Sequence, residues 1–277
     1  MKKKTLVGKW VLTIVMFIIG IMCIFPFIFM LSSSFKLSGN VMKFPFEPIP
    51  NPFTMDNYKA LFQSEYFDFG RWYANTTVMT LTSIVFKLVF VTMAAYAFAK
   101  IKFKGSDWMF LLLLAGLMIP GDIMIMPRYI IFKNLSILDS MWAIVLPSVV
   151  DVYFLFMLRQ AMIGIPESIS EAARIDGCSH LTIYSRIILP LAKPAIATMV
   201  LFSFVWTWND YMSPYLYISS VEKQMLSVGI KLFADGQVQD YGSQMASATL
   251  VLLPIIVVFL FCQKYFIESV SGSAVKG

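Results

Sequence analysis

Long apolar runs separated by short polar segments are the feature that most limits how this 277-residue chain can fold. A helix rises about 1.5 Å per residue, so about 20 apolar residues cross the roughly 30 Å hydrocarbon core of a bilayer. Runs near this length lie at residues 10–31, 74–99, 108–127, 142–158, 194–213 and 246–263. We therefore expect an all-α integral membrane protein with six transmembrane helices in a single transmembrane domain, residues 1–277.

The composition excludes several other classes of protein. With 58% hydrophobic and 14% charged residues, the chain is too apolar for an ordinary soluble core. The net charge of +6 is dispersed between apolar runs and forms no basic stripe, so we expect no nucleic-acid partner. His180 is the only histidine, and the three cysteines show no CxxC spacing. We expect neither a metal site nor catalytic residues, and we expect no cofactor.

The distribution of basic residues predicts the orientation in the membrane. Lys and Arg near span ends are retained in the cytoplasm. With both termini inside, 13 basic residues lie on the cytoplasmic side and 8 outside, while Lys87 falls within a span. The reversed orientation would place the larger group outside, so we expect cytoplasmic termini.

The polar loop 159–193, between the fourth and fifth runs, carries the most informative local pattern. Ser168 and Glu171 have the spacing of a capping box, which predicts a short helix beginning at Ser168. Gly177 can end that helix in a left-handed conformation. A second amphipathic segment runs from about Ser179 to Ile188. From the residues alone, a plain interfacial connector explains this loop equally well.

The same loop supports a family resemblance. Glu171-Ala172-Ala173-Arg174-Ile175-Asp176-Gly177, followed by Ile188-Leu189-Pro190, resembles the EAA signature of ABC importer permeases. The resemblance covers nearly the whole chain and is strongest to maltose-type carbohydrate permeases. Cys178 departs from it, because alanine is commoner there. The resemblance implies a coupling helix that docks on an ATPase, with these coupling residues: Glu171, Ala172, Ala173, Asp176, Gly177, Leu189 and Pro190.

The resemblance also implies partners and a location. It predicts three protein partners: a second permease subunit, which forms a heterodimer with this chain, a cytoplasmic ABC ATPase dimer, and an extracytoplasmic sugar-binding protein. The predicted location is a prokaryotic cytoplasmic membrane, whose lipid surrounds the spans. The chain lacks the GxxxxGK[ST] phosphate loop, so ATP hydrolysis is expected in a separate subunit and the chain is not itself an enzyme. The expected transported substrate is a carbohydrate, and we take an oligosaccharide as the hypothesis. The resemblance implies that the tail Ser273–Gly277 reaches the ATPase; a frayed terminus is the alternative.

Polar residues within the runs suggest two further sites. Lys87 and Asp151 each need a partner or water in the membrane, and we expect an ion pair or a shared hydrated cavity. Separate solvation of the two charges is the alternative. Trp206, Asn209 and Asp210 lie at i, i+3 and i+4, which places them on one helical face that could line a sugar pathway. Aromatic residues also collect at membrane interfaces for purely physical reasons.

Two other functional classes remain open at this level. A secondary transporter or channel would need an ion-coupling site and no ATPase, and Lys87 and Asp151 are its only support. An integral-membrane enzyme would need clustered His, Cys or carboxylate groups at one interface, and the sequence shows none. Neither class explains the EAA segment.

Overall fold

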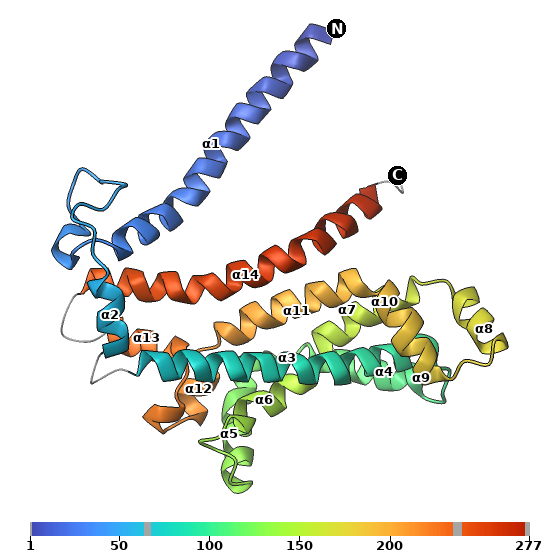
Figure 1. Cartoon of the computed structure of the whole chain (residues 1–277). Coiled ribbons are helices and arrows are strands. Elements are labelled where there is room, and N and C mark those ends of the chain that lie inside the picture. The colour runs from blue at the N-terminus through green and yellow to red at the C-terminus, as the bar shows by residue number, and fades with distance from the viewer. Residues whose placement is uncertain (1, 64–67, 235–239, 275–277) are drawn as a thin grey trace. The chain divides into compact units, whose positions relative to one another are not determined.

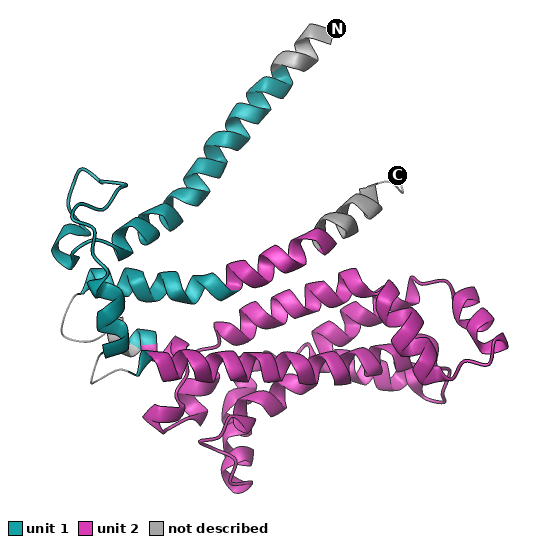
Figure 2. Ribbon diagram, in the orientation of Figure 1, with its two compact units in different colours: residues 1–69, 230–254 teal, residues 70–229, 255–277 magenta. Residues whose placement is uncertain are grey.

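The computed structural model of the chain describes residues 2–63, 68–234 and 240–274. Within these ranges the regular structure is entirely helical, which confirms the all-α class. The chain divides into two compact units (Figure 2). Unit 1 comprises Met1–Phe69 and Ile230–Pro254, and unit 2 comprises Gly70–Gly229 and Ile255–Gly277.

Unit 1 is built around the end of its first long helix, α1 (Lys2–Ser34). The short helix α2 (Asp56–Gln63) supplies Asn57, whose Nδ2 donates to Ser34 O at 2.8 Å and to Lys36 O at 2.7 Å. These bonds satisfy carbonyls that a helix end leaves without partners. Asp240 caps the start of α14 (Tyr241–Ala274) by accepting from the Ser243 amide at 3.1 Å.

Unit 2 consists of helices of very unequal length (Figure 1). The longest is α3 (Phe69–Lys100), an unbroken helix that is long and apolar enough to cross a membrane. The remaining helices are α4 (Ser106–Gly116), α5 (Ile125–Asn134), α6 (Trp142–Val149), α7 (Val152–Ile163), α8 (Glu167–Ile175), α9 (His180–Ile183), α10 (Leu189–Leu191), α11 (Lys193–Trp208), α12 (Met212–Tyr217) and α13 (Leu226–Ala234), the last extending into unit 1.

Several predicted spans are interrupted in the structure. Four helical segments of the described chain are long and apolar enough to cross a membrane: Gly8–Ser34, Phe69–Lys100, Trp142–Ile163 and Tyr241–Tyr265. Two bent helix pairs raise the number to six if each is one span. The prediction of continuous helices over 108–127 and 194–213 is wrong in detail: α4 ends at Gly116, and α11 ends at Trp208.

Proline lies at the bend of each of the two bent helix pairs. Pro120 precedes the turn into α5, and the two arms of this pair are bent by 89°. Pro194 lies at the start of α11, which is bent by 78° from the preceding helical segment. A proline removes an amide donor and restricts the residue before it, so helices commonly end there. The predicted run 142–158 also breaks at Val150 and Asp151, whose backbones are extended.

The main apolar core of unit 2 lies where α3, α7, α8, α9 and α11 meet. Phe154, Leu158, Met162, Ile183 and Met199 are fully buried in it. Burying one such side chain contributes about 1.5–3 kcal/mol. This core fixes the loop 159–193 firmly to the long helix α3, while α1 and much of α4 expose apolar side chains suited to lipid or to a partner in the membrane.

Candidate functional site

The helix α8 begins one residue before the predicted start. Pro166 precedes its first residue, Glu167, and no side chain caps the first turn. The predicted capping box of Ser168 and Glu171 is therefore wrong. Pro166 is the N-cap residue, with φ −54° and ψ 135°. Glu167 places a negative charge in the first turn, where the helix dipole favours it.

The C-terminal end of α8 has the geometry that the sequence predicts. Gly177 has φ +80°, in the left-handed region. Its amide donates to Arg174 O at 3.0 Å, and the Cys178 amide donates to Ala173 O at 2.9 Å. This pair of bonds is a Schellman motif, which satisfies the last carbonyls of the helix. Any other residue at 177 would strain the backbone here, although a Cβ would meet no atom within 4 Å.

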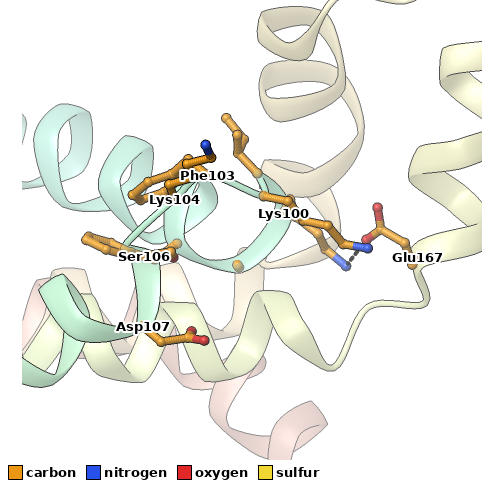
Figure 3. Close-up of a pocket in the computed structure, with 10 residues that line it drawn as sticks. Lys100, Phe103, Lys104, Ser106, Asp107 and Glu167 are labelled. Carbon is orange, nitrogen blue, oxygen red and sulfur yellow. Dashed lines mark hydrogen bonds and ion pairs between the residues drawn. The ribbon is translucent and has the colours of Figure 1, made fainter.

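A charged network holds α8 to the end of α3, and the sequence analysis missed it. The buried Lys100 Nζ donates to Ile165 O at 2.7 Å and to Glu167 Oε2 at 3.2 Å. Arg174 donates from Nη2 to Glu167 Oε1 at 3.3 Å. Figure 3 shows Lys100 and Glu167 joined across the two elements. A buried ammonium needs such a partner, so Lys100 fixes the position of Glu167.

Of the predicted coupling residues on α8, most face outward. Glu171, Ala172, Asp176 and Gly177 are exposed, whereas Ala173 is buried against the core. Ile175 is 87% exposed.

The second half of the loop continues the same surface into α11. Ser179 caps α9 by accepting from the Thr182 amide at 3.3 Å. A π turn, Tyr184–Ile188, joins α9 to α10, and Leu189 packs beside the core while Pro190 is exposed. The Tyr184 hydroxyl lies 2.7 Å from Thr92 Oγ1 of α3. The predicted amphipathic segment is thus a continuous helical arm attached to α3.

The structure brings Lys87 and Asp151 together. Lys87 Nζ lies 3.3 Å from Asp151 Oδ2, and the Lys87 residue is only 4% exposed. Asp151 also caps α7: its Oδ1 accepts from the Tyr153 amide at 3.2 Å and the Phe154 amide at 3.4 Å. One carboxylate therefore pairs with a buried ammonium and also accepts hydrogen bonds from the first amides of α7, which have no partner within the helix.

Trp206, Asn209 and Asp210 do not share one helical face. The helix ends at Trp208, since Asn209 Nδ2 donates back to Val205 O at 2.8 Å and Asp210 lies in the following turn. The half-exposed Trp206 instead packs against Tyr153 of α7, with ring centroids 5.6 Å apart. Asp210 Oδ1 accepts from the Ser213 amide at 3.2 Å.

A second cluster that the sequence analysis missed lies in the loops beside α12. Asp139 Oδ1 accepts from the Ser220 amide at 2.8 Å and the Ser219 amide at 3.0 Å. Its Oδ2 accepts from Lys223 Nζ at 2.8 Å and Ser220 Oγ at 2.6 Å. Bonds from Lys223 and then Ser220 hold the pKa of this carboxyl well below its ordinary value. We call Asp139, Ser219, Ser220 and Lys223 the loop clamp.

Comparison with known proteins gives consistent results. Residues 88–272 match the family of binding-protein-dependent transport system inner membrane components. The chain is 31% identical to the arabinooligosaccharides transport system permease protein AraQ of Halalkalibacterium halodurans, and the match covers all of both chains. It is 30% identical to the multiple sugar-binding transport system permease protein MsmG of Streptococcus mutans, again over both whole chains.

A solved structure shares the fold. A chain of a bacterial ABC transporter that imports the acidic polysaccharide alginate superposes with a TM-score of 0.82 at 24% identity, covering 94% of this chain and 96% of that one. The family match covers most of the chain, and the recognised resemblance is confirmed. The chain therefore belongs to the binding-protein-dependent inner membrane components, the permeases of ABC importers.

Proposed function

We propose that this chain is one permease subunit of an ABC importer that carries an oligosaccharide into the cell. The observation that carries this proposal is α8, an exposed helix with the EAA residues that is fixed to the transmembrane core by buried contacts. Its outward residues provide a docking surface, and its inward residues connect that surface to α3, α7 and α11. Such a helix transmits a conformational change of a bound partner to the transmembrane helices.

The coupling residues have distinct proposed roles. Glu171, Ala172 and Asp176 form the contact surface for the ATPase, together with Ile175. Ala173 packs inward, and Gly177 provides the turn that returns the chain to the core. Leu189 and Pro190, in the arm leading into α11, pass the movement on to that helix.

The substrate class is proposed from the relatives. Two full-length relatives are named as permeases for arabinooligosaccharides and for multiple sugars. A second solved neighbour, with a TM-score of 0.64 at 16% identity, is an alginate ABC transporter in complex with a periplasmic protein bound to an alginate pentasaccharide. By analogy, an extracytoplasmic protein would deliver sugar to this chain and a second permease, above a dimer of separate ATPase subunits.

The proposed orientation follows the distribution of basic residues and places α8 in the cytoplasm.

The sugar pathway is proposed beside the aromatic pair of Trp206 and Tyr153, since exposed aromatic faces can stack on sugar rings. Asn209 and Asp210 would act at the outer end of α11, where their side chains order the turn into α12. The tail Ser273–Gly277, whose last residues lie outside the described ranges, is proposed as a second ATPase contact.

The proposal is tested by co-purifying the native complex in mild detergent and assaying the eluate for ATPase activity. Ile175→Asp places a charge on the docking surface, and we expect it to lose the ATPase. Val221→Asp is the matched control, because Val221 is also an exposed β-branched residue, at 60%, but lies in the loop beside α12. Retention of the ATPase by the Ile175 variant, or its absence from wild type, would contradict the proposal.

A further inference from the structure

A cavity of about 590 Å³ lies where α3 ends and α4 begins (Figure 3). Its lining combines two kinds of surface. Lys100, Lys102, Lys104 and Ser106 provide cationic and polar groups. Phe98, Ala99, Ile101 and Phe103 provide apolar walls, and Asp107 and Glu167 complete the lining. A ligand that matches this cavity therefore carries a negative charge beside an apolar body.

The charges in the cavity are only partly neutralised from within the chain. Lys100 is paired with Glu167, as described above. Lys102 and Lys104 are exposed, and neither has a hydrogen bond or ion pair within the part of the chain that the structure describes. Asp107 supplies one negative charge against these two positive ones. The cavity thus retains an excess of positive charge.

The start of α4 adds to the attraction for an anion. Gly105 precedes this 11-residue helix; the Ser106 amide donates to Phe103 O at 3.3 Å, and no side chain caps the amides that follow it. Uncapped amides at a helix N-terminus, together with the helix dipole, favour a phosphate group. Figure 3 shows Lys104 and Ser106 on one side of the cavity and Lys100 with Glu167 on the other. An anion bound between them would lie close to polar or cationic groups on both sides of the cavity.

The surroundings favour a lipid over a free anion. Immediately beyond the cavity, α4 exposes apolar side chains: Trp108 is 68% exposed, Leu111 65% and Leu112 60%. These side chains could lie along acyl chains, and tryptophan commonly marks the membrane interface. A free phosphate would use none of this apolar surface. The predicted orientation places the cavity at the cytoplasmic leaflet, where anionic lipids meet basic residues.

We propose that this cavity binds the phosphate headgroup of an anionic phospholipid, with Lys102 and Lys104 as the charged contacts and α4 along the acyl chains. Two lysines near such a headgroup make phosphatidylglycerol bind about 30-fold more tightly than a zwitterionic lipid. The ligand class follows from the charge and the apolar lining of the cavity. It does not depend on which sugar the importer carries.

The test titrates the full-length chain, purified in detergent, with phosphatidylglycerol or with phosphatidylcholine of the same acyl chains, and counts bound lipids by native mass spectrometry. Wild type is expected to prefer phosphatidylglycerol by about 30-fold. Lys102→Gln with Lys104→Gln should abolish the preference, while Lys102→Arg with Lys104→Arg should keep it. The matched control is Arg186→Gln with Lys193→Gln, which removes the same charge from exposed sites outside the cavity.

Two results would overturn the proposal. One is equal retention of phosphatidylglycerol by the Lys102 and Lys104 glutamine variant and by the Arg186 and Lys193 control. The other is displacement of bound phosphatidylglycerol by millimolar inorganic phosphate alone, which would identify a site for a free anion rather than for a lipid. Retention in the presence of phosphate, together with loss in the glutamine variant alone, supports the lipid site.

Discussion

At the residue scale, Asp151 performs two tasks that are usually divided between side chains. Its Oδ1 caps α7, and its Oδ2 binds the ammonium of Lys87. The Lys87 side chain is 5% exposed and that of Asp151 is 22% exposed. An ionised lysine in this position depends on its partner, because few water molecules can reach it. The pair therefore stabilises the break between α6 and α7.

A double-variant experiment measures this coupling. Asp151→Asn keeps an oxygen to cap α7 but leaves Lys87 buried beside a neutral group, so we expect a loss of about 3 kcal/mol in unfolding free energy. Adding Lys87→Met should restore most of that loss, since no unpaired charge then remains. The measurement is denaturation in detergent of both single variants and the double variant. Strictly additive losses would show that the two side chains do not interact.

At the element scale, the loop clamp joins two connections that are far apart in the sequence. Asp139 lies between α5 and α6, and its partners Ser219, Ser220 and Lys223 follow α12. Asp139 itself has φ +57°, a left-handed conformation that aspartate tolerates better than most residues. The carboxylate accepts four bonds from that second connection, which orders it.

Removing the negative charge should loosen this clamp. Asp139→Asn retains an oxygen for the Ser219 and Ser220 amides but loses the carboxylate bond to Lys223, so trypsin should cleave after Lys223 severalfold faster. Asp122→Asn is the matched control, because Asp122 is exposed and its carboxylate has no bonded partner among the described residues. Limited proteolysis at increasing times gives the rate. Equal cleavage in both variants would contradict the assigned role of Asp139.

The clamp also has a defined pH dependence. The pKa of Asp139 is lowered in the folded chain, so its stabilising contribution is complete above the unfolded value near 3.8 and is lost as the pH falls through the lower folded value. Cleavage after Lys223 should therefore be insensitive to Asp139 protonation between about pH 5 and 8.

The sequence predicts the all-helical class well and several of the helix ends poorly. The all-helical class and the left-handed turn at Gly177 depend on local chemistry, and the sequence predicts both correctly. Glu167 was not recognised as a site residue, since its role depends on Lys100, 67 residues earlier in the sequence. The end of α11 at Trp208 was also missed, because no proline or glycine marks it; Asn209 instead folds back onto Val205.

At the scale of the whole molecule, the two units carry different features. Unit 2 holds α8, the lipid cavity and the Lys87–Asp151 pair, so the proposed coupling and lipid contacts lie within one compact body. Unit 1 holds α1, whose window of highest hydropathy has no buried residues. A helix so apolar and so exposed requires lipid or another membrane subunit around it, which agrees with a permease that works in a larger complex.

ATP-driven import is measured as transport in proteoliposomes that contain this chain, a second permease and an ATPase, with a labelled oligosaccharide and a binding protein outside. We expect uptake only when ATP is hydrolysed and the binding protein is present, and loss of that uptake in the Ile175→Asp complex. Uptake that persists without ATP and follows an imposed ion gradient would contradict this expectation and would identify a secondary transporter.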